Sequence, residues 1–204
     1  MPALPLPYLI ALVLAAYLVG SISFAVVVSR LYGLPDPRTF GSRNPGATNM
    51  LRGGNRQAAL WTLIGDTLKG VLAVLFAQAV LPVGPQAELW LALVSVAVFL
   101  GHLFPVFFGF AGGKGVATAA GILVALDWSL GLCTLLVWGG VFALTRVSSM
   151  AALGAALLAP LFAALLLGRG PLLGAVVLMA ALLIWRHRSN IRKLLAGEEA
   201  AFKR

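Results

Sequence analysis

Charged residues are scarce in this sequence, and their scarcity excludes an ordinary water-soluble fold. Only 10% of the 204 residues are charged, whereas 61% are hydrophobic. A soluble domain would carry about 25% charged residues. Water cannot solvate so much apolar surface, so the lipid bilayer must be the solvent for most of the chain. We therefore expect one membrane domain that covers residues 1–204.

Cysteine, histidine and acidic residues are few as well. The one cysteine, Cys133, lies in an apolar run, so no disulfide framework can form. Six acidic residues and two histidines, widely spread, offer no convincing metal cluster, and we expect neither a metal nor a cofactor. The 15 Lys and Arg residues give a net charge of +9. In a membrane protein this excess indicates basic cytoplasmic loops rather than nucleic-acid binding.

Several catalytic motifs are also missing. The HxxxxD pattern of acyl-CoA acyltransferases is absent, because Phe107 and Arg192 stand five residues after the two histidines. No GxSxG nucleophile elbow occurs. Phe108 and Gly115 replace the first glycine and the hydroxyl residue of a Walker A loop, which disfavours nucleotide hydrolysis.

Long apolar runs are abundant by contrast, and most approach the roughly 20 residues needed to cross a bilayer. The run at 116–126 is short and needs the glycine loop before it or a tilt, and the last run is expected to continue as helix past Trp185. Asp127 separates two of the runs. The seven runs lie at about 6–29, 57–80, 89–108, 116–126, 128–145, 150–167 and 171–185.

The positions of Lys and Arg select this number of spans. With seven spans and a periplasmic N-terminus, every Lys and Arg lies on the inner side except Arg169, which is outside, and Lys69, which is within a span. Six spans would divide these residues evenly between the two sides. The positive-inside rule therefore predicts an all-α integral membrane protein with seven transmembrane helices, a periplasmic N-terminus and a cytoplasmic C-terminus.

Three polar segments interrupt the apolar pattern, and in this topology all three are cytoplasmic. They lie at about 30–56, 109–118 and 186–204. Together they bring glycine-rich backbone, hydroxyl groups, amides and fixed positive charge to one membrane face. Glycine-rich backbone can present successive N–H groups to an oxyanion, and a helix N-terminus adds positive potential. The pattern is typical of an anion-binding site.

Candidate site residues are distributed over these segments. Lys114 lies between Gly113 and Gly115, where a loop is expected to enter a helix. With Gly112 the segment has three glycines, which is more than a simple turn requires. His187 and Asn190 are three apart on one helical face, where the histidine could position or deprotonate a hydroxyl. Arg52 and Arg56, four apart, would share a helical face and either clamp a phosphate or contact lipid headgroups. The other candidates are Ser42, Asn44, Thr48, Asn49, Gly112, Gly113 and Gly115.

Polar residues also occur inside the expected spans. Asp66 and Lys69 are three apart in the second run, where they either form an internal ion pair or serve the function directly. His102 precedes Pro105 near the inner end of the third run, and we expect it to be a structural hydrogen-bonding residue.

These motifs together resemble the PlsY family, the bacterial acyl-phosphate:glycerol-3-phosphate acyltransferases. The resemblance covers essentially the whole chain. It is carried by GSRNPGATN at 41–49 with Arg52, by Gly65-Asp66 with Lys69-Gly70, by Gly101-His102, by GGKGVAT at 112–118, and by His187-Arg188-x-Asn190-Ile191 with Gly197-Glu198 behind.

The resemblance implies a multi-pass enzyme of the bacterial inner membrane with its active site facing the cytoplasm. Such an enzyme transfers a fatty acyl group from acyl phosphate to the 1-hydroxyl of glycerol 3-phosphate, giving lysophosphatidic acid and phosphate. Its donor is made by a soluble partner, PlsX, with which contact is expected. The resemblance assigns the phosphate-handling and catalytic positions to Ser42, Arg52, Lys114, His187 and Asn190, and the supporting loops to Asn44, Thr48, Asn49 and the three glycines.

Two positions depart from the family pattern. Arg43 stands where the family usually has glycine, so a left-handed backbone position would be lost or a cation gained at the rim of the site. Ser23 stands where many members have proline, which concerns the geometry of the first span.

The implied chemistry leaves two questions open. Acyl phosphate is an activated mixed anhydride, so the enzyme must mainly bring two anions together, and Arg52 and Lys114 would offset their repulsion. Either His187 or a substrate phosphate, whose second pKa is about 6, accepts the proton, and we favour the phosphate. The alternative function is a membrane transporter of a small organic phosphate, although the chain lacks the internal repeat common in transporters.

Overall fold

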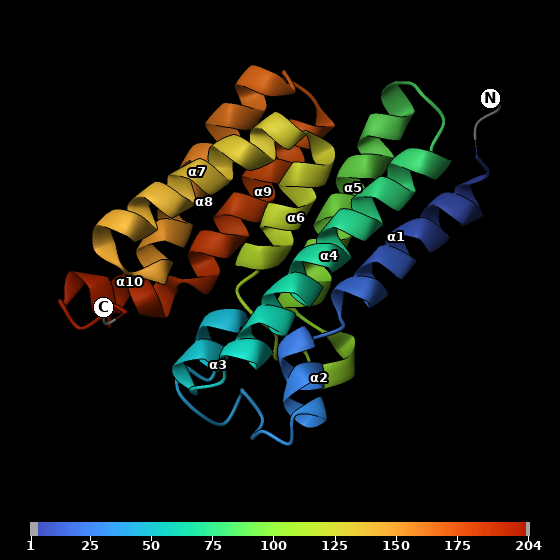
Figure 1. Cartoon of the computed structure of the whole chain (residues 1–204). Coiled ribbons are helices and arrows are strands. Elements are labelled where there is room, and N and C mark those ends of the chain that lie inside the picture. Colours follow the sequence, from blue (N-terminus) through green and yellow to red (C-terminus); the bar gives the residue numbers. More distant parts are fainter. Residues whose placement is uncertain (1–3, 203–204) are drawn as a thin grey trace.

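The chain folds as a bundle of helices, which a computed structural model describes over residues 4–202 (Figure 1). No strand occurs in this part of the chain, so the all-α expectation is confirmed. The elements in order are α1 (Leu6–Gly20), α2 (Phe24–Leu31), α3 (Ala47–Arg52), α4 (Arg56–Val80), α5 (Pro85–Leu103), the short 3-10 helix η1 (Val106–Phe108), α6 (Val116–Leu126), α7 (Trp128–Thr145), α8 (Ser148–Leu166), α9 (Pro171–Arg186) and α10 (Arg188–Leu195).

Every expected apolar run overlaps a helix, a bent pair of helices or, for the run at 89–108, α5 followed by η1. Four helical stretches are long and apolar enough to cross a membrane, and up to six are if the bent pairs α1–α2 and α9–α10 each form one span. Helix α6 has 11 residues, which at 1.5 Å per residue cover roughly half of the hydrocarbon core. The protein is therefore a multi-pass membrane protein, while the count of seven spans stays a prediction.

The first run is not one continuous helix as expected. It breaks at residues 21–23, and α1 and α2 meet at a bend of 46°. The Ile22 carbonyl freed by the break accepts a hydrogen bond from Lys69 Nζ at 2.9 Å. Ser21 Oγ donates to the Tyr17 carbonyl at 2.9 Å. Because neighbouring side chains satisfy the backbone, the break can lie inside an apolar bundle.

Lys69 belongs to a buried polar cluster that joins α4 and α5. Its Nζ lies 2.9 Å from Asp66 Oδ1 and 2.8 Å from His102 Nδ1. The two charged side chains on α4 are almost fully buried, so each provides the partner that the other needs away from water. The expected internal ion pair is therefore present and His102 is hydrogen-bonded as expected. Asp66 and His102 also line the cavity described below, so the structural role of these residues stays a prediction.

Helix α6 packs closely against α4 and ends at Asp127. Glycines let it approach α4 closely, because a Cβ at Gly70 would collide with the Thr118 carbonyl and one at Gly121 with the Thr67 carbonyl. At its C-terminal end Asp127 caps the next helix by accepting a hydrogen bond from the Leu130 amide at 2.8 Å. The expected helix boundary at Asp127 is confirmed.

All three polar segments lie at the same end of the bundle. Helices α2, α3 and α10 and the loop before α6 gather at the lower end of Figure 1, while the turn between α8 and α9 lies at the opposite end. The expected continuation past Trp185 exists as α10, but it bends by 57° at His187. Arg52 ends α3 and Arg56 begins α4, so the expectation that these residues share one helical face was wrong.

Candidate active site

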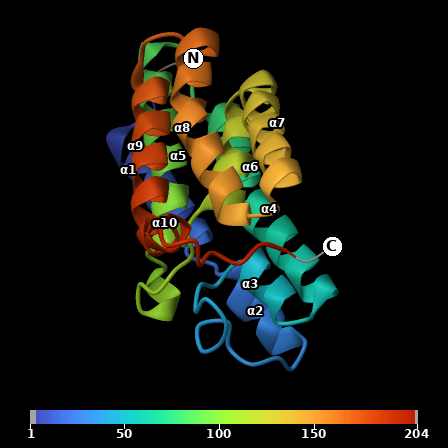
Figure 2. The same ribbon diagram turned by 90° about the vertical axis from the view of Figure 1, so that its left-hand side faces the viewer.

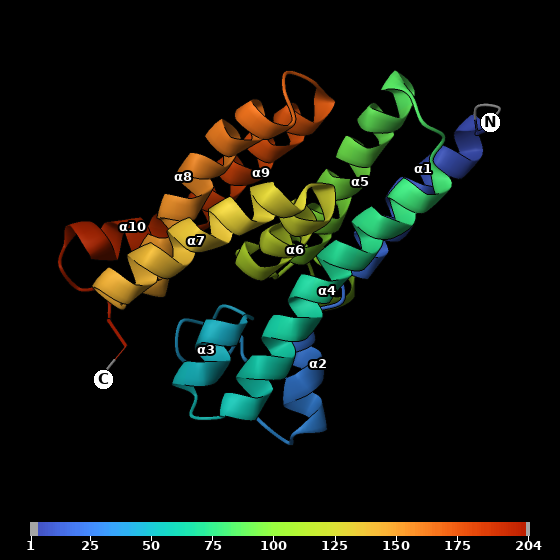
Figure 3. The ribbon, with the colours of Figure 1, turned by 45° about the horizontal axis from the view of Figure 1, so that its top comes forward.

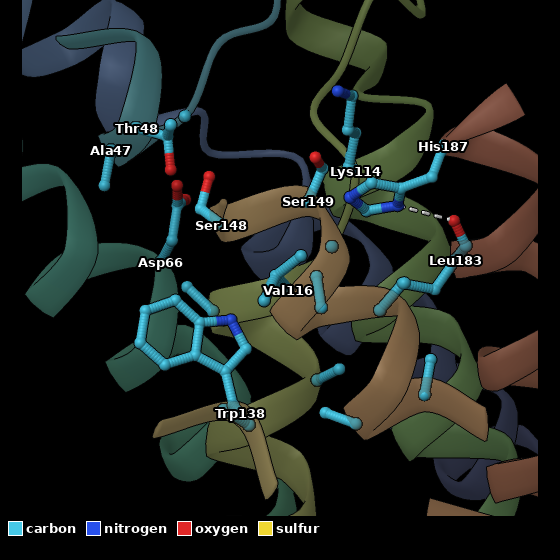
Figure 4. Close-up of a pocket in the computed structure, with 18 of the residues that line it drawn as sticks. Ala47, Thr48, Asp66, Lys114, Val116, Trp138, Ser148, Ser149, Leu183 and His187 are labelled. Atoms are coloured by element: carbon cyan, nitrogen blue, oxygen red, sulfur yellow. Dashed lines mark hydrogen bonds between the residues drawn. The ribbon is translucent and has the colours of Figure 1, made fainter. Parts of the chain in front are cut away.

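A cavity of about 410 Å³, the main cavity, extends from the polar segments into the bundle. Its outer part, the mouth, holds polar groups from loops and helix ends (Figure 4). Its inner part, the shaft, is lined mainly by residues of α6, α7, α8 and α9, which are neighbours in the bundle (Figure 3). The structure thus brings together candidates from all three polar segments. Those that line the main cavity are Ser42, Asn44, Thr48, Asn49, Arg52, Lys114, Gly115, His187 and Asn190.

Lys114 is linked to the end of the chain through a polar network. Its Nζ donates to Asn190 Oδ1, and Asn190 Nδ2 donates to Glu199 Oε1 at 2.6 Å. Ser149 Oγ at the start of α8 donates to the same Glu199 oxygen at 2.8 Å. The network ties the glycine loop, α10, α8 and the tail together around the mouth.

The tail after α10 runs toward α3 and α4 (Figure 2), and its residue Glu199 lines the main cavity. Arg52 Nη2 donates to the Ala200 carbonyl at 3.1 Å, and the Arg52 guanidinium carbon lies 5.5 Å from the centroid of the Phe202 ring. The Phe202 amide donates to the Arg146 carbonyl at 2.9 Å. These contacts hold the Arg52 guanidinium at the rim of the cavity.

Lys114 lies in surroundings that destabilise its positive charge. Burial lowers its pKa from 10.5 to about 8. Glu199 opposes this effect, whereas the nearby cations Arg52, Arg186 and Lys193 add to it. A bound phosphate dianion would relieve the repulsion among these cations, so the arrangement favours an anionic ligand.

The His187 ring is oriented by the backbone. Its Nδ1 lies 2.8 Å from the Leu183 carbonyl (Figure 4). Because a carbonyl oxygen only accepts hydrogen bonds, Nδ1 carries the proton in the neutral ring and Nε2 is left as an acceptor. Burial lowers the His187 pKa to about 4, so the ring is neutral at physiological pH. It can accept a hydrogen bond from an alcohol but is a weak base.

The glycine loop before α6 is held by close packing. A Cβ at Gly112 would collide with the His102 carbonyl, and one at Gly113 with the His102 ring. Arg186 donates to the Gly113 carbonyl at 3.0 Å and to the Gly112 carbonyl at 2.6 Å. The Gly113 amide donates to the His102 carbonyl at 3.1 Å, so it is occupied within the protein and does not face an oxyanion. Gly115, with a φ of 87°, provides the left-handed turn into α6.

Asn49 organises the first polar loop. Its side-chain oxygen accepts hydrogen bonds from the Ser42 amide at 2.9 Å and from Ser42 Oγ at 3.2 Å, and its Nδ2 donates to the Pro37 and Phe40 carbonyls. Asn49 therefore holds Ser42 in place. Arg43 beside it has a φ of 56°, so the left-handed backbone position is kept despite the side chain.

Some residues of the mouth were not singled out from the sequence. Ser148 and Ser149 begin α8 and line the cavity, and Glu199 joins the polar network. From the sequence, Arg186 indicated only which side of the membrane its segment faces, whereas in the structure it holds the glycine loop. Adjacent serines at a helix start are a common N-terminal pattern, so only the fold reveals that these two face a cavity.

The shaft is lined by small and branched apolar side chains. Helix α8 has alanines at every third or fourth position, so its face toward the cavity carries short side chains. This continuous apolar space suits a fatty acyl chain. The lining residues include Ala152, Ala155, Ala156, Ala159, Val176, Met179, Ala180, Leu123, Val124, Leu135 and Trp138.

Comparison with known proteins gives consistent matches. A family model described as glycerol-3-phosphate acyltransferase matches residues 10–197. The glycerol-3-phosphate acyltransferase of Ralstonia pickettii is 62% identical over 187 residues, which are 92% of this chain and 90% of the relative. That of Burkholderia thailandensis is 59% identical over 188 residues, which are 91% of this chain and 92% of the relative.

Solved structures agree in fold over almost the full length. The crystal structure of PlsY (YgiH), an integral membrane glycerol 3-phosphate acyltransferase, in its glycerol 3-phosphate form matches with a TM-score of 0.89 at 39% identity, covering 96% of each chain. The lysophosphatidic acid form matches with a TM-score of 0.86 at 38% identity and the same coverage. The chain therefore belongs to the glycerol-3-phosphate acyltransferase family, and specifically to its PlsY type.

Proposed function

We propose that this protein acylates the 1-hydroxyl of glycerol 3-phosphate with acyl phosphate as the donor, giving lysophosphatidic acid and phosphate. Solved relatives are described as glycerol 3-phosphate and lysophosphatidic acid forms, which are the acceptor and the product of this reaction. The single observation that carries the donor assignment is one continuous cavity with a cationic mouth and an apolar shaft. An acyl phosphate has the same division between an anionic head and an apolar chain.

The proposed topology has seven spans, a periplasmic N-terminus and a cytoplasmic C-terminus in the bacterial inner membrane. Helix α6 and the glycine loop before it would together make the fourth crossing. The mouth then faces the cytoplasm as part of a single membrane domain. The excess of Lys and Arg at the mouth end supports this orientation, because basic residues accumulate on the cytoplasmic side. A cytoplasmic mouth could receive acyl phosphate from the soluble partner PlsX.

The mouth would assist the reaction mainly by charge. Two anionic substrates repel each other at short range, and Lys114 and Arg52 would offset that repulsion. The same cations would stabilise the negative charge that develops on the carbonyl oxygen of the acyl group and on the phosphate that leaves. Ser42, Asn44 and Thr48 supply further hydrogen-bonding groups at the same cavity wall. Holding the alcohol beside the anhydride then converts a slow encounter into a unimolecular step.

His187 and Asn190 would hold the acceptor. The free Nε2 of His187 would accept a hydrogen bond from the attacking hydroxyl. With a pKa of about 4, His187 is a poorer proton acceptor than a phosphate monoester, whose second pKa is about 6. We therefore assign the proton to a substrate phosphate.

An assay of the purified full-length protein in detergent tests this function. With palmitoyl phosphate and glycerol 3-phosphate, we expect lysophosphatidic acid and phosphate in equal amounts. Palmitoyl-CoA in place of palmitoyl phosphate should give no product. Folded protein that forms no lysophosphatidic acid, but moves glycerol 3-phosphate into proteoliposomes, would establish the transporter alternative instead.

A further inference from the structure

A second, shallower cavity of about 240 Å³ adjoins the mouth of the main cavity. We propose that it is an additional anion subsite, which binds the phosphate group of glycerol 3-phosphate before the reaction or inorganic phosphate after it. The assignment to the substrate phosphate or to the product phosphate rests on the proposed function, but the binding of phosphate itself does not. We call this cavity the arginine basin, and it is lined by Arg43, Arg186, Arg188, Arg192, Ser189 and Gly112, with Ser42, Asn44 and Lys114 shared with the main cavity.

The arginines of the basin are not paired with carboxylates in the described part of the chain. Among the described residues that line the basin, none is acidic. Over residues 4–202 the ion pairs are Arg38 with Asp36 and the buried cluster around Asp66, and neither includes a basin arginine. A group of like charges without counterions raises the local concentration of anions, so the basin would attract phosphate from solution.

Two of the four arginines are fixed in place. Arg186 donates to the Gly112 and Gly113 carbonyls. Arg188 lies over the Trp185 ring, 4.8 Å from its centroid, and donates to the Trp185 carbonyl at 3.4 Å. These contacts pre-organise one wall of the basin before any ligand arrives.

The other two arginines are available to a ligand. Arg43 and Arg192 are exposed, and within residues 4–202 their side chains make no hydrogen bond to the protein. Guanidinium groups bind phosphate oxygens with two parallel hydrogen bonds, so these side chains could close on a phosphate from opposite segments of the chain.

The backbone conformation of Arg43 is unusual for a residue with a side chain. A φ of 56° is unfavourable for any residue with a Cβ and favours glycine. The conformation is held by the Arg43 amide, which donates to the Phe40 carbonyl at 2.9 Å, and by the adjoining bonds of Ser42 to Asn49. Glycine would adopt it without strain, so the backbone gives no reason for an arginine here.

Lys114 connects the arginine basin to the main cavity. Because this lysine lines both, a phosphate held by Arg43 and Arg192 would lie next to the cation that we assign to the reaction. One phosphate group must reach the main cavity and another must leave it in every turnover. A neighbouring cationic subsite shortens both paths.

Two variants and a matched control test the arginine basin in the full-length protein. Arg43→Gly removes a guanidinium while relieving the strained backbone, and Arg192→Gln removes one from α10. Arg169→Gln makes the same change in net charge at the exposed turn between α8 and α9, at the opposite end of the bundle. Thermal unfolding should show that all three variants fold. For each, kcat, KM for glycerol 3-phosphate and the inhibition constant of inorganic phosphate are measured at low ionic strength.

The kinetic pattern identifies which phosphate uses the basin. If it receives glycerol 3-phosphate, each basin variant lowers kcat/KM roughly two- to fivefold, as for an exposed ion pair, and leaves kcat unchanged. If it receives the leaving phosphate, kcat falls and inhibition by phosphate weakens, while kcat/KM is kept. Either effect should fade in high salt. Constants equal to those of the wild type and of Arg169→Gln in both basin variants would overturn the proposal.

Direct binding separates this proposal from the proposed function. Titration of the detergent-solubilised protein with inorganic phosphate, without donor, should give weaker binding for Arg43→Gly and Arg192→Gln than for Arg169→Gln. That result would support the arginine basin even if the wild type formed no lysophosphatidic acid. If the wild type is active and all variants bind phosphate equally, the arginine basin is contradicted while the proposed function stands.

Discussion

The mouth and the shaft of the main cavity are built from different parts of the helices. The mouth consists of loops and helix ends that carry Lys114, Arg52, His187 and Asn190. The shaft consists of helix faces on which small residues, such as Ala159, leave room. Charges at the mouth would select and align the two head groups, whereas the shaft would select the acyl chain. In the proposed function, one cavity would therefore separate reaction chemistry from donor specificity, and substitutions could change each part alone.

The largest expected effect comes from removing the central cation of the mouth. Lys114→Ala deletes a charge-assisted hydrogen bond of about 2 to 3 kcal/mol, so kcat/KM for glycerol 3-phosphate should fall roughly 30- to 150-fold. Lys114→Arg keeps the charge and should keep more of the activity. Steady-state kinetics with palmitoyl phosphate measure both. An unchanged rate for Lys114→Ala would remove this lysine from the site.

A change in the shaft should affect the donor rather than the acceptor. Ala159 is 4% exposed and lies on the cavity side of α8, so Ala159→Phe would fill the shaft. Overpacking of about 1 to 3 kcal/mol predicts a roughly 5- to 150-fold loss with palmitoyl phosphate, and a much smaller loss with octanoyl phosphate. Competition between the two donors measures the ratio of their kcat/KM values. Ala164→Phe on the outer face of α8 should leave the ratio unchanged.

A smaller effect is expected at His187 if the histidine only holds the hydroxyl. His187→Gln preserves an acceptor near the position of Nε2, so the loss in kcat should be no more than about five- to tenfold, the value of one hydrogen bond. Removal of a general base would instead cost about 100-fold or more. Near-complete loss of kcat in His187→Gln with intact glycerol 3-phosphate binding would contradict proton transfer to a substrate phosphate.

The smallest expected effect is the pH dependence that Lys114 imposes on the mouth. The pKa of this lysine is lowered to about 8, so it is charged below pH 8 and neutral above it. Because kcat/KM reports the free enzyme, it should fall by about half near pH 8 and further at higher pH. Lys114→Arg, which stays charged, should lack this decline. A wild-type profile that stays flat to pH 10 would argue against a charged Lys114 in binding.

The mouth could be predicted from the sequence more completely than the shaft. Short polar and glycine-rich runs such as 41–49 and 112–118 are conspicuous in an apolar chain, and a consistent topology placed them on one face. Alanines that line the shaft look the same in the sequence as alanines that face lipid. Only the packing of α8 against its neighbours distinguishes Ala159 from Ala164.

Features that depend on contacts between distant segments were missed for a physical reason. The break between α1 and α2 is satisfied by Lys69, which comes 47 residues after Ile22 in the chain. The tail reaches the mouth because Glu199 meets Ser149, a residue of α8. Local propensity carries no information about such partners. Local sequence was sufficient for Asp127, because this residue caps a helix through Leu130, only three residues further along the chain.

The central claim is that cations at the mouth hold the phosphate group of the acceptor. Equilibrium binding of glycerol 3-phosphate to the wild type, Lys114→Ala and Arg52→Gln, measured without donor in low and high salt, tests it most directly. We predict that each variant binds glycerol 3-phosphate at least about fivefold more weakly than the wild type does. High salt should lower the affinity of the wild type until it approaches that of the variants, and glycerol should not bind. Equal affinity of all three proteins for glycerol 3-phosphate would contradict the account.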